Sequence, residues 1–521
     1  MSELTGMHRY KRTGSAGAIP AGSASAPGYV RKTILLIAVL ALFRLFAAFS
    51  LELGNDESYY WMYSGQVKGN YFDHPPGVAF LIRICTLNGL LQGAGWLRLG
   101  AVLCAAGAAW CLFRAVSLLH TPRAGFYAAG LYSASFYAGV TAGVYIMPDS
   151  PQMLFWTGAL WMLARISRNQ RDWKSWLLFG AAAGGCIMSK VHGVFLWSGL
   201  GLYILVHRRD WLRLPQLYAA GVITAILVSP ILFWNISHDF ITYRFHSRRV
   251  TVDHFEIRTW DFLREVVGQL VFNNPVNVVL ILLSLRAWKQ YQPELRRFLP
   301  VFLWIAVPHI AFLLFVALFR DTTLPHWSGP AYVTLLPLAA VGLAAGRRRR
   351  FLPRPLMGAV ALYLLTVTAW LCVVHFYPGT YGSQERKQLG RGDISLDLYG
   401  WQAAGEQFAR RYAADAAAGK MPSQAPIVAS YWWGAHIEYY FCRSARIPFR
   451  AVGPIPDIRE YHWRNAEKKD SANLSVAYCI MPADEQYQLP GGYANVQHLY
   501  DIEVPRGGKP AHLFQVYRLA R

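Results

Sequence analysis

Residues 55–76 concentrate acids, a histidine and aromatic side chains directly after a long apolar run. Asp56 and Glu57 stand near the start of this segment, NDESYYWMYSGQVKGNYFDHPP, and Asp73 and His74 stand near its end. A carboxylate here can accept a proton from an attacking hydroxyl group, which is the work of a general base. The alternatives are a solvated loop, solvation of a helix end, or pairing with a nearby arginine. The apolar and aromatic character of the segment favours chemistry over a solvated loop.

Three more polar residues lie beside apolar runs. Asp149 follows Met147-Pro148 and opens an apolar run, so it is a candidate for a helix N-cap, alone or combined with a role in a reactive site. Lys190 and His192 lie between two apolar runs with few polar neighbours. An ammonium group buried near a membrane face requires an anion, and a lipid-linked phosphate suits lysine, which binds phosphate as a compact charge. Snorkelling of Lys190 to the headgroups is the alternative.

Two further segments bring basic side chains next to apolar runs. The segment after Asn235 contains the basic stretch Arg244–Arg249, and Pro325-His326-Trp327 leads into a later apolar run. Positive charge at a membrane surface suits phosphate headgroups and ordinary lipid contact equally. An aromatic belt accounts for Trp327 better than for His326.

The composition places the chain in a membrane. Its 521 residues are 54% hydrophobic and only 15% charged, whereas in soluble domains about a quarter of the residues are charged. Several apolar runs reach the roughly 20 residues needed to cross a bilayer. The sequence therefore predicts a polytopic α-helical protein with about eleven spans, near 33–51, 98–118, 123–143, 150–166, 174–190, 192–207, 215–235, 266–285, 298–319, 328–346 and 355–374.

The net charge of +22 would suggest nucleic acid in a soluble protein. Here the basic residues cluster in short gaps beside the apolar runs, which is the positive-inside pattern, so no nucleic acid is expected. With eleven spans and a cytoplasmic N-terminus, these clusters fall on the cytoplasmic side. Counting Gly77–Leu91 as a further span would place the later basic loops on the external side of the membrane. We therefore interpret this segment as an interfacial or re-entrant helix in the first external loop.

The sequence predicts three regions. Residues 1–32 form a disordered cytoplasmic tail, 33–375 a transmembrane domain, and 376–521 a small external domain of mixed α/β structure. The first apolar run is long enough to remain as an anchor, so no cleaved signal is expected. Cys442 and Cys479 can form a disulfide if the last region lies outside the cytoplasm. That region has a helical pattern over Gly400–Ala418 and strand-like runs at Pro426–Tyr431, Leu474–Met481, Val496–Val504 and His512–Tyr517.

Several common enzyme motifs are missing from the sequence. It contains no P-loop, no dinucleotide-binding glycine pattern, no HExxH and no GxSxG. Soluble nucleotide cofactors are therefore not expected. Chemistry in this chain would have to act on a substrate that is already in the membrane.

The polar motifs occur in an order that resembles a known family. They are the acidic pair after the first apolar run, then YFDHPP, PDSP, SKxxG, WNxxHD and PHW. Over roughly residues 33–375 they resemble the bacterial glycosyltransferase family 39 branch of the GT-C superfamily. That branch is related to the protein O-mannosyltransferases and to the lipid A aminoarabinose transferase. The resemblance implies transfer of a sugar from a polyprenyl-phosphate carrier to a lipid, glycan or protein acceptor at the external face of the bacterial inner membrane.

The resemblance also implies roles for individual residues. Asp56 corresponds to the catalytic base, supported by Glu57, and Asp149 to a second acidic position. Lys190 matches a lysine near the carrier phosphate, and His74 stands where relatives often carry lysine. The remaining candidates for substrate binding are His192, Arg244 and His326. No cofactor is expected, because cationic side chains can stabilise a monophosphate leaving group without a metal. A divalent ion held by Asp56, Glu57 and Asp149 is the less favoured arrangement.

A lipid or sugar transporter or flippase, without transfer chemistry, is the alternative function. Transporters typically show two related halves and charges near the midplane of the membrane. Here no halves repeat, and the polar motifs gather at one face. The sequence therefore favours an enzyme.

Overall fold

The computed structural model describes residues 26–252, 255–287, 293–345, 352–467, 474–485 and 489–521. The chain divides into two compact units. Unit 1 comprises Met1–Phe46 and Arg98–Leu365, and unit 2 comprises Ala47–Leu97 and Thr366–Arg521. The segment that follows the first apolar run therefore belongs with the C-terminal residues rather than with the other helices.

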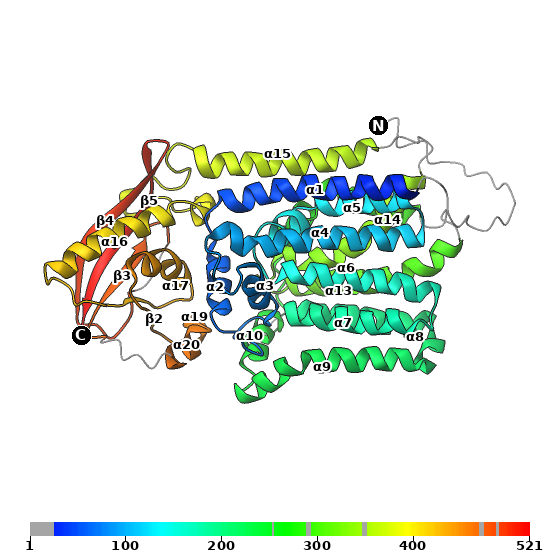
Figure 1. Ribbon diagram of the computed structural model, residues 1–521, viewed down its shortest axis with the longest axis horizontal. Helices are drawn as coiled ribbons and strands as arrows, with labels where there is room; N and C mark the ends of the chain where they lie inside the picture. Colours follow the sequence, from blue (N-terminus) through cyan, green and yellow to red (C-terminus); the bar gives the residue numbers. More distant parts are fainter. Residues whose placement is uncertain (1–25, 253–254, 288–292, 346–351, 468–473, 486–488) are drawn as a thin grey trace. The chain divides into compact units, whose positions relative to one another are not determined.

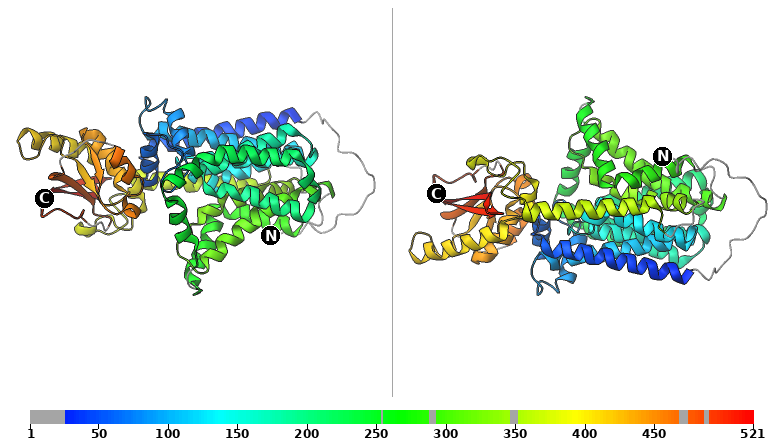
Figure 2. Two further views of the ribbon diagram at one scale, coloured as in Figure 1. Left: turned by 90° about the horizontal axis from the view of Figure 1, so that it is seen from below. Right: turned by 90° about the horizontal axis from the view of Figure 1, so that it is seen from above.

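Unit 1 is built from long helices that run roughly parallel to one another (Figures 1 and 2). This confirms the prediction of a polytopic α-helical protein, and helices occupy all the predicted spans. In chain order the helices that contribute to unit 1 are α1 (Ala26–Ser50), α4 (Ala94–Leu119), α5 (Pro122–Ala134), α6 (Asp149–Arg168), α7 (Trp173–Ser189), α8 (Val194–His207), α9 (Pro215–Ser237), α10 (Ile241–Val250), α11 (Thr259–Phe272), α12 (Pro275–Arg286), α13 (Pro293–Ala317), α14 (Gly329–Ala345) and α15 (Arg354–Phe376).

Among the described residues, six helices are long and apolar enough to cross a membrane by themselves. They are Gly28–Ser50, Ala94–Leu119, Pro215–Ser237, Leu299–Ala317, Pro325–Ala345 and Arg354–Phe376. The first of these starts before residue 33. Residues 26–32 of the predicted tail are thus helical, while residues 1–25 lie outside the described part.

The apolar run predicted as a span at 266–285 contains a sharp break. Helices α11 and α12 meet there at an angle of 95°. Pro275 has no N–H to continue the first helix, and it disfavours helical geometry at the residue before it. Asn274 occupies the break and donates hydrogen bonds to the carbonyl oxygens of Ala134 and Ala359, at 2.9 and 3.1 Å. Its side-chain oxygen caps α12 by accepting from the N–H of Val276.

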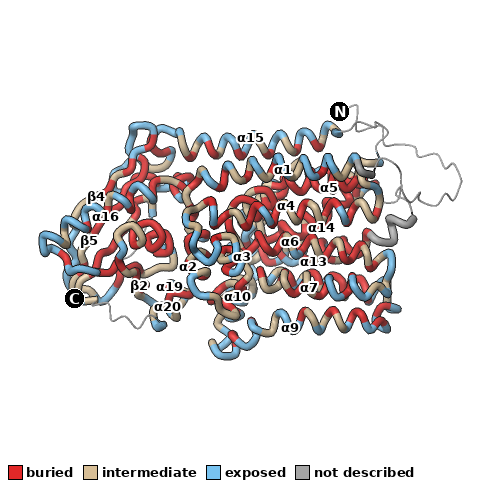
Figure 3. The backbone as a smooth tube through the Cα atoms, viewed as in Figure 1, coloured by how far each residue is buried: buried red, intermediate tan, exposed pale blue. Residues whose placement is uncertain are grey.

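The core of unit 1 lies around α5, α6 and α14, and Figure 3 shows these helices largely buried. In the apolar stretch that contains α14, 72% of the residues are buried, against 17% for α9. Small residues allow close helix packing: a Cβ at Gly180 of α7 would overlap the carbonyl oxygen of Ala220 on α9. Arg44 of α1 is buried, and its guanidinium donates to the carbonyl oxygens of Ser133 and Gly139.

Unit 2 combines short helices with a five-stranded sheet in the order β2-β1-β3-β5-β4. The small mixed α/β part is therefore confirmed. Strands β1 and β2 pair in parallel, as do β1 and β3, whereas β5 runs antiparallel to both β3 and β4. The strands are β1 (Ile427–Ala429), β2 (Phe449–Ala451), β3 (Val476–Pro482), β4 (Asn495–Arg506) and β5 (Lys509–Ala520), and the longest helix after α15 is α16 (Trp401–Ala417).

The segment 47–97 contributes α2 (Asn55–Ser64) and α3 (Gly77–Cys85) to unit 2. At nine residues, α3 is about 13 Å long, which is far short of a bilayer core of about 30 Å. This agrees with the interpretation of Gly77–Leu91 as a segment that does not span. Cys442 and Cys479 are both free thiols, so the structure does not contain the disulfide considered from the sequence.

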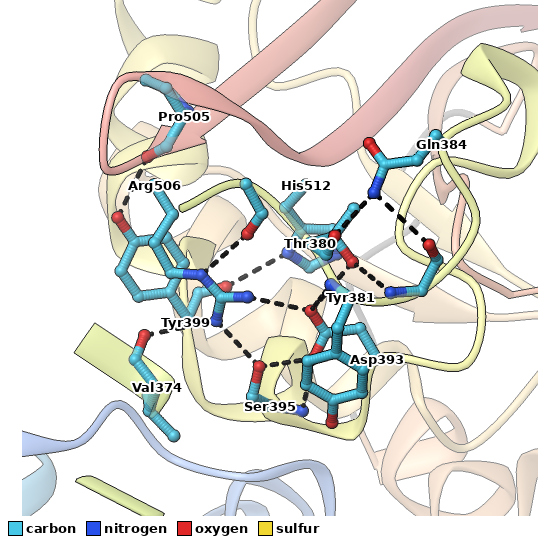
Figure 4. Close-up of polar contacts among 12 residues, drawn as sticks. Val374, Thr380, Tyr381, Gln384, Asp393, Ser395, Tyr399, Pro505, Arg506 and His512 are labelled. Atoms are coloured by element: carbon cyan, nitrogen blue, oxygen red, sulfur yellow. Dashed lines mark hydrogen bonds and ion pairs between the residues drawn. The ribbon is translucent and has the colours of Figure 1, made fainter. Parts of the chain in front are cut away.

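A buried ion pair anchors the end of α15 to the sheet within unit 2 (Figure 4). Arg506 of β4 and Asp393 are both inaccessible to solvent and lie 2.9 Å apart. The guanidinium also donates to Ser395 Oγ and to the carbonyl oxygens of Val374 and Gly379. Thr380 donates to the same carboxylate. Each buried charge thus has several hydrogen-bond partners, which is the condition for burying an ion pair at little cost.

Candidate functional site

A first candidate site is a buried ion pair in unit 1. Asp149 is the first residue of α6, and Lys190 follows directly after the last residue of α7. The Lys190 Nζ atom lies 2.9 and 2.7 Å from the two carboxylate oxygens of Asp149. Tyr137 donates its hydroxyl to Asp149 Oδ1 at 2.8 Å. The side chains of Lys190 and Asp149 are 5% and 1% exposed, so snorkelling of Lys190 to the surface is not what the structure shows.

The carboxylate of Asp149 balances the positive charge of Lys190. A lipid phosphate is therefore not needed to explain why Lys190 is buried. A lysine ammonium has three donors, and Asp149 accepts two of them. One N–H therefore remains for a third acceptor, in an environment where an unsatisfied charge is costly.

Histidines gather around this pair. His192 and His309 have ring centroids 5.7 Å apart, and His309 stacks on Phe195 at 3.9 Å. His326 lies close enough to interact electrostatically with both Asp149 and Lys190. The Nδ1 atom of His192 is buried and has no hydrogen-bond partner among the described residues. We refer to Asp149, Lys190, His192, His309 and His326 as the charged cluster of unit 1.

His309 was missed by the sequence reasoning. It follows Pro308 within α13, in a stretch that is long and apolar enough to cross a membrane, and it is fully buried. An ionisable residue inside a span is a functional candidate by default. The position of His309 inside an apolar run could therefore have identified it as a candidate from the sequence alone.

In α10 the structure separates the two ends of the basic stretch. Arg244 is exposed, and its guanidinium donates to the backbone carbonyl of Asp239. Arg249 instead lies over the ring of Trp327, 4.8 Å from its centroid, and interacts electrostatically with His326. Arg249 is therefore the arginine of α10 that belongs with the charged cluster, whereas Arg244 faces solvent.

A second candidate site lies in unit 2 and begins with the acidic pair. Asp56 and Glu57 both stand in the first turn of α2. Glu57 is 2% exposed, and its Oε2 atom accepts the backbone N–H of Gly54 at 2.9 Å. This contact is the return half of a capping box. Asp56 is exposed, so of the two acids it is the one that an incoming substrate can reach.

The end of the same segment is held by buried contacts within unit 2. Tyr63 donates its hydroxyl to Asp73 Oδ1, and Arg459 donates to Asp73 Oδ2 at 3.1 Å. Burial keeps the pKa of Tyr63 well above its usual value, so the phenol stays neutral and able to donate. His74, the next residue, is half-buried and packs edge-on against Tyr60, with ring centroids 5.6 Å apart.

A neighbouring acid, Glu460, fixes the backbone of this segment. Its carboxylate accepts the N–H of Phe72 at 2.9 Å and pairs with Lys68 at 2.8 Å. Sequence reasoning missed Arg459 and Glu460, which lie almost 400 residues from their partners. No local pattern marks them. Among the described residues, no group of three or more His, Cys, Asp or Glu side chains is arranged to hold a metal ion.

The comparisons with known proteins agree with this architecture. Residues 73–234 match the family described as dolichyl-phosphate-mannose-protein mannosyltransferase. A lipid A galacturonosyltransferase, RgtD, of Rhizobium johnstonii is 25% identical over 190 residues. That match covers 36% of this chain and 40% of the relative's length.

Two solved structures of ArnT from Cupriavidus metallidurans share the fold almost end to end. The one bound to undecaprenyl phosphate has a TM-score of 0.59 at 16% identity, covering 95% of this chain and 98% of ArnT. The apo structure has a TM-score of 0.57 at 14% identity with the same coverage. The chain thus shares the fold of these ArnT structures. Its similarity to the mannosyltransferase family, to RgtD and to ArnT confirms the resemblance noted in its motifs.

Proposed function

We propose that this protein transfers a sugar from a polyprenyl-phosphate carrier to an acceptor at the external face of the bacterial inner membrane. The observation that carries the proposal is the charged cluster of unit 1, in which one acid stands among a lysine and three histidines. A phosphate group suits a cluster in which hydrogen-bond donors outnumber the single acid. The relatives add support, because ArnT was crystallised with undecaprenyl phosphate and RgtD is named for sugar transfer.

In the proposed reaction Asp56 is the general base. The acceptor hydroxyl oxygen attacks the anomeric carbon of the carried sugar, and Asp56 takes the hydroxyl proton. The bond between that carbon and the carrier phosphate oxygen breaks, and its electron pair leaves with the phosphate. Exposure of Asp56 supports this assignment, whereas Glu57 is occupied in capping α2.

The hydrogen-bond donors of the cluster have the complementary role of holding the leaving phosphate. Lys190 retains one N–H after bonding Asp149, and Arg249 and His326 bring further donors to the same cluster. Preorganised donors aimed at developing charge supply the largest share of stabilisation in many enzymes. We propose that these groups suffice without a divalent metal, so turnover should withstand EDTA. Asp149 keeps Lys190 in place.

The test uses purified protein in proteoliposomes with a labelled polyprenyl-phosphate sugar and candidate acceptors. Asp56→Asn should lower the transfer rate by roughly 10²–10⁴-fold, the usual cost of removing a general base. Asp457→Asn is the matched control, because Asp457 is another exposed aspartate at the start of a short helix in unit 2. Near-normal turnover in Asp56→Asn would refute the base assignment. Movement of the donor across the membrane without any transfer would instead identify a flippase.

A further inference from the structure

A cavity of about 300 Å³ in unit 2 has three arginines and no acid among its lining residues. Helices α2 and α3, which pack against each other (Figure 1), form one wall with the turn that follows α3. Tyr439, Arg443 and Arg464 of the C-terminal segment form the other. The volume lies at the lower end of small-molecule sites, so the cavity fits a headgroup-sized ligand.

Two of these arginines lack an acidic partner. Arg83 donates to the Asn88 side-chain oxygen, and Arg443 donates to Gln92 Oε1 at 2.9 Å. Among the described residues, neither guanidinium forms an ion pair with a carboxylate. Arg464, by contrast, pairs with the buried Glu438. The cavity therefore carries two positive charges that the protein itself does not neutralise.

The free donors of these arginines suit a phosphate. A guanidinium has five N–H groups in a planar fork, and the contacts just described use one on each side chain. Such a fork binds phosphate oxygens in pairs. Arg443 is also held in place by aromatic rings, at 4.3 Å from the centroid of Tyr439 and 5.4 Å from that of Trp61. One half of the site is thus already organised before a ligand arrives.

The segment 80–90, which lines part of the cavity, also exposes large apolar side chains next to the lining residues in the sequence. Ile84 and Leu90, on α3 and the turn after it, are 70% and 80% exposed, and Phe80 and Leu87 are 48% and 58% exposed. Phe80 and Ile84 lie four residues apart on one face of α3, and Leu87 and Leu90 follow in the turn after it. A cluster of large apolar side chains exposed beside positive charge is typical of a surface that contacts anionic lipid.

We propose that this cavity binds the phosphate headgroup of an anionic membrane lipid, with the acyl chains lying against Phe80, Ile84, Leu87 and Leu90. The phosphate lies between the guanidinium groups of Arg83 and Arg443. The site shares no residue with the charged cluster of unit 1 and requires no sugar transfer. It therefore holds whether or not the proposed reaction is correct.

Native mass spectrometry of the full-length protein tests this proposal, with dioleoylphosphatidylglycerol, dioleoylphosphatidylcholine and glycerol 1-phosphate as probes. Phosphatidylglycerol should bind in preference to phosphatidylcholine. The double variant Arg83→Gln/Arg443→Gln should weaken its binding at least about tenfold, as expected for loss of charge-assisted hydrogen bonds. Arg410→Gln is the matched control, because Arg410 is an exposed arginine of α16 in the same unit. Unchanged binding in the double variant would overturn the proposal.

The contribution of the exposed apolar side chains is tested separately by Ile84→Ser/Leu90→Ser. This variant should bind phosphatidylglycerol more weakly while binding glycerol 1-phosphate as the wild type does. If glycerol 1-phosphate binds as tightly as the lipid, the cavity is a soluble-phosphate site and the lipid assignment is wrong. Equal binding of phosphatidylcholine would overturn the requirement for an anionic headgroup. Thermal unfolding of each variant shows that it is folded, and single Arg83→Gln replaces the double variant if that protein unfolds.

Discussion

The ion pair between Asp149 and Lys190 gives the sharpest quantitative prediction. Replacing Lys190 with methionine keeps the length of the side chain but leaves the Asp149 carboxylate buried beside the Tyr137 hydroxyl, which still donates to it. Removing one partner of a buried ion pair costs about 3–5 kcal/mol, because the other charge is left uncompensated. Removing both charges together avoids that penalty. Lys190→Met should therefore be severely destabilised, and Asp149→Asn/Lys190→Met should recover most of the loss.

The measurement is the free energy of unfolding in mixed micelles, by titration with SDS and tryptophan fluorescence. Lys174→Met is the control, because Lys174 is exposed on the same helix and its replacement should change stability by no more than about 0.5 kcal/mol. If Lys190→Met costs no more than Lys174→Met, the ion pair is not buried as the structure has it. If the double variant is no more stable than Lys190→Met, the unpaired Asp149 charge is not the cause.

The double variant also separates structure from function. It should be folded, yet it lacks the ammonium group that we assign to the carrier phosphate. Titration with a polyprenyl-phosphate donor should then show weaker binding in the double variant than in wild type, despite similar stability. Wild-type donor affinity in the stable double variant would make Lys190 a purely structural residue.

Three other predictions follow from unit 2 and from the topology. Glu57→Gln should keep most activity and stability, because glutamine also closes a capping box. Glu57→Ala should lower the free energy of unfolding by about 0.5–2 kcal/mol, measured by thermal unfolding. A large loss of activity in Glu57→Gln would instead make Glu57 catalytic. Burial raises the pKa of Glu52 from 4.5 to about 7. Between pH 4.5 and 7 the folded state therefore keeps a proton on Glu52 that the unfolded state has released. Stability should fall as pH rises from about 4.5 to 7, by on the order of 3 kcal/mol, and Glu52→Gln should remove that slope in unfolding midpoints. Phosphatase fused near Leu118 should be inactive and fused near Ile146 active, and the reverse pattern would contradict the proposed orientation.

Helix positions were predictable because apolar runs of membrane length leave few alternatives. The break at Asn274 was not predicted, although Pro275 signalled it: a hydropathy pattern averages over a break that a single proline and its preceding residue impose. In the C-terminal part, the strands around β3, β4 and β5 were found from alternation and β-branched content. Strand β1 lies within the run predicted at Pro426–Tyr431, whereas β2, which is equally short, was missed.

The partners of the buried charges were harder to predict than their positions. Asp149 and Lys190 were each singled out, but as separate candidates for a helix cap and a phosphate contact. A short connection between α6 and α7 makes these helices antiparallel neighbours, so the start of one lies beside the end of the other. That step was available from the sequence. The pairing of Asp73 with Arg459 was not, because it depends on how the C-terminal segment folds against residues 47–97.

The acidic pair shows why residue type alone does not assign chemistry. Asp56 and Glu57 are adjacent and both acidic, yet a helical turn of 100° per residue sends their side chains in different directions. Glu57 is three residues after Gly54, the position from which a carboxylate reaches back to the first free N–H of the helix. Gly54 has no side chain to complete the familiar serine or threonine signature, so the sequence hides half of the capping box. Asp56, which that geometry leaves exposed, is the carboxylate to which we assign proton transfer.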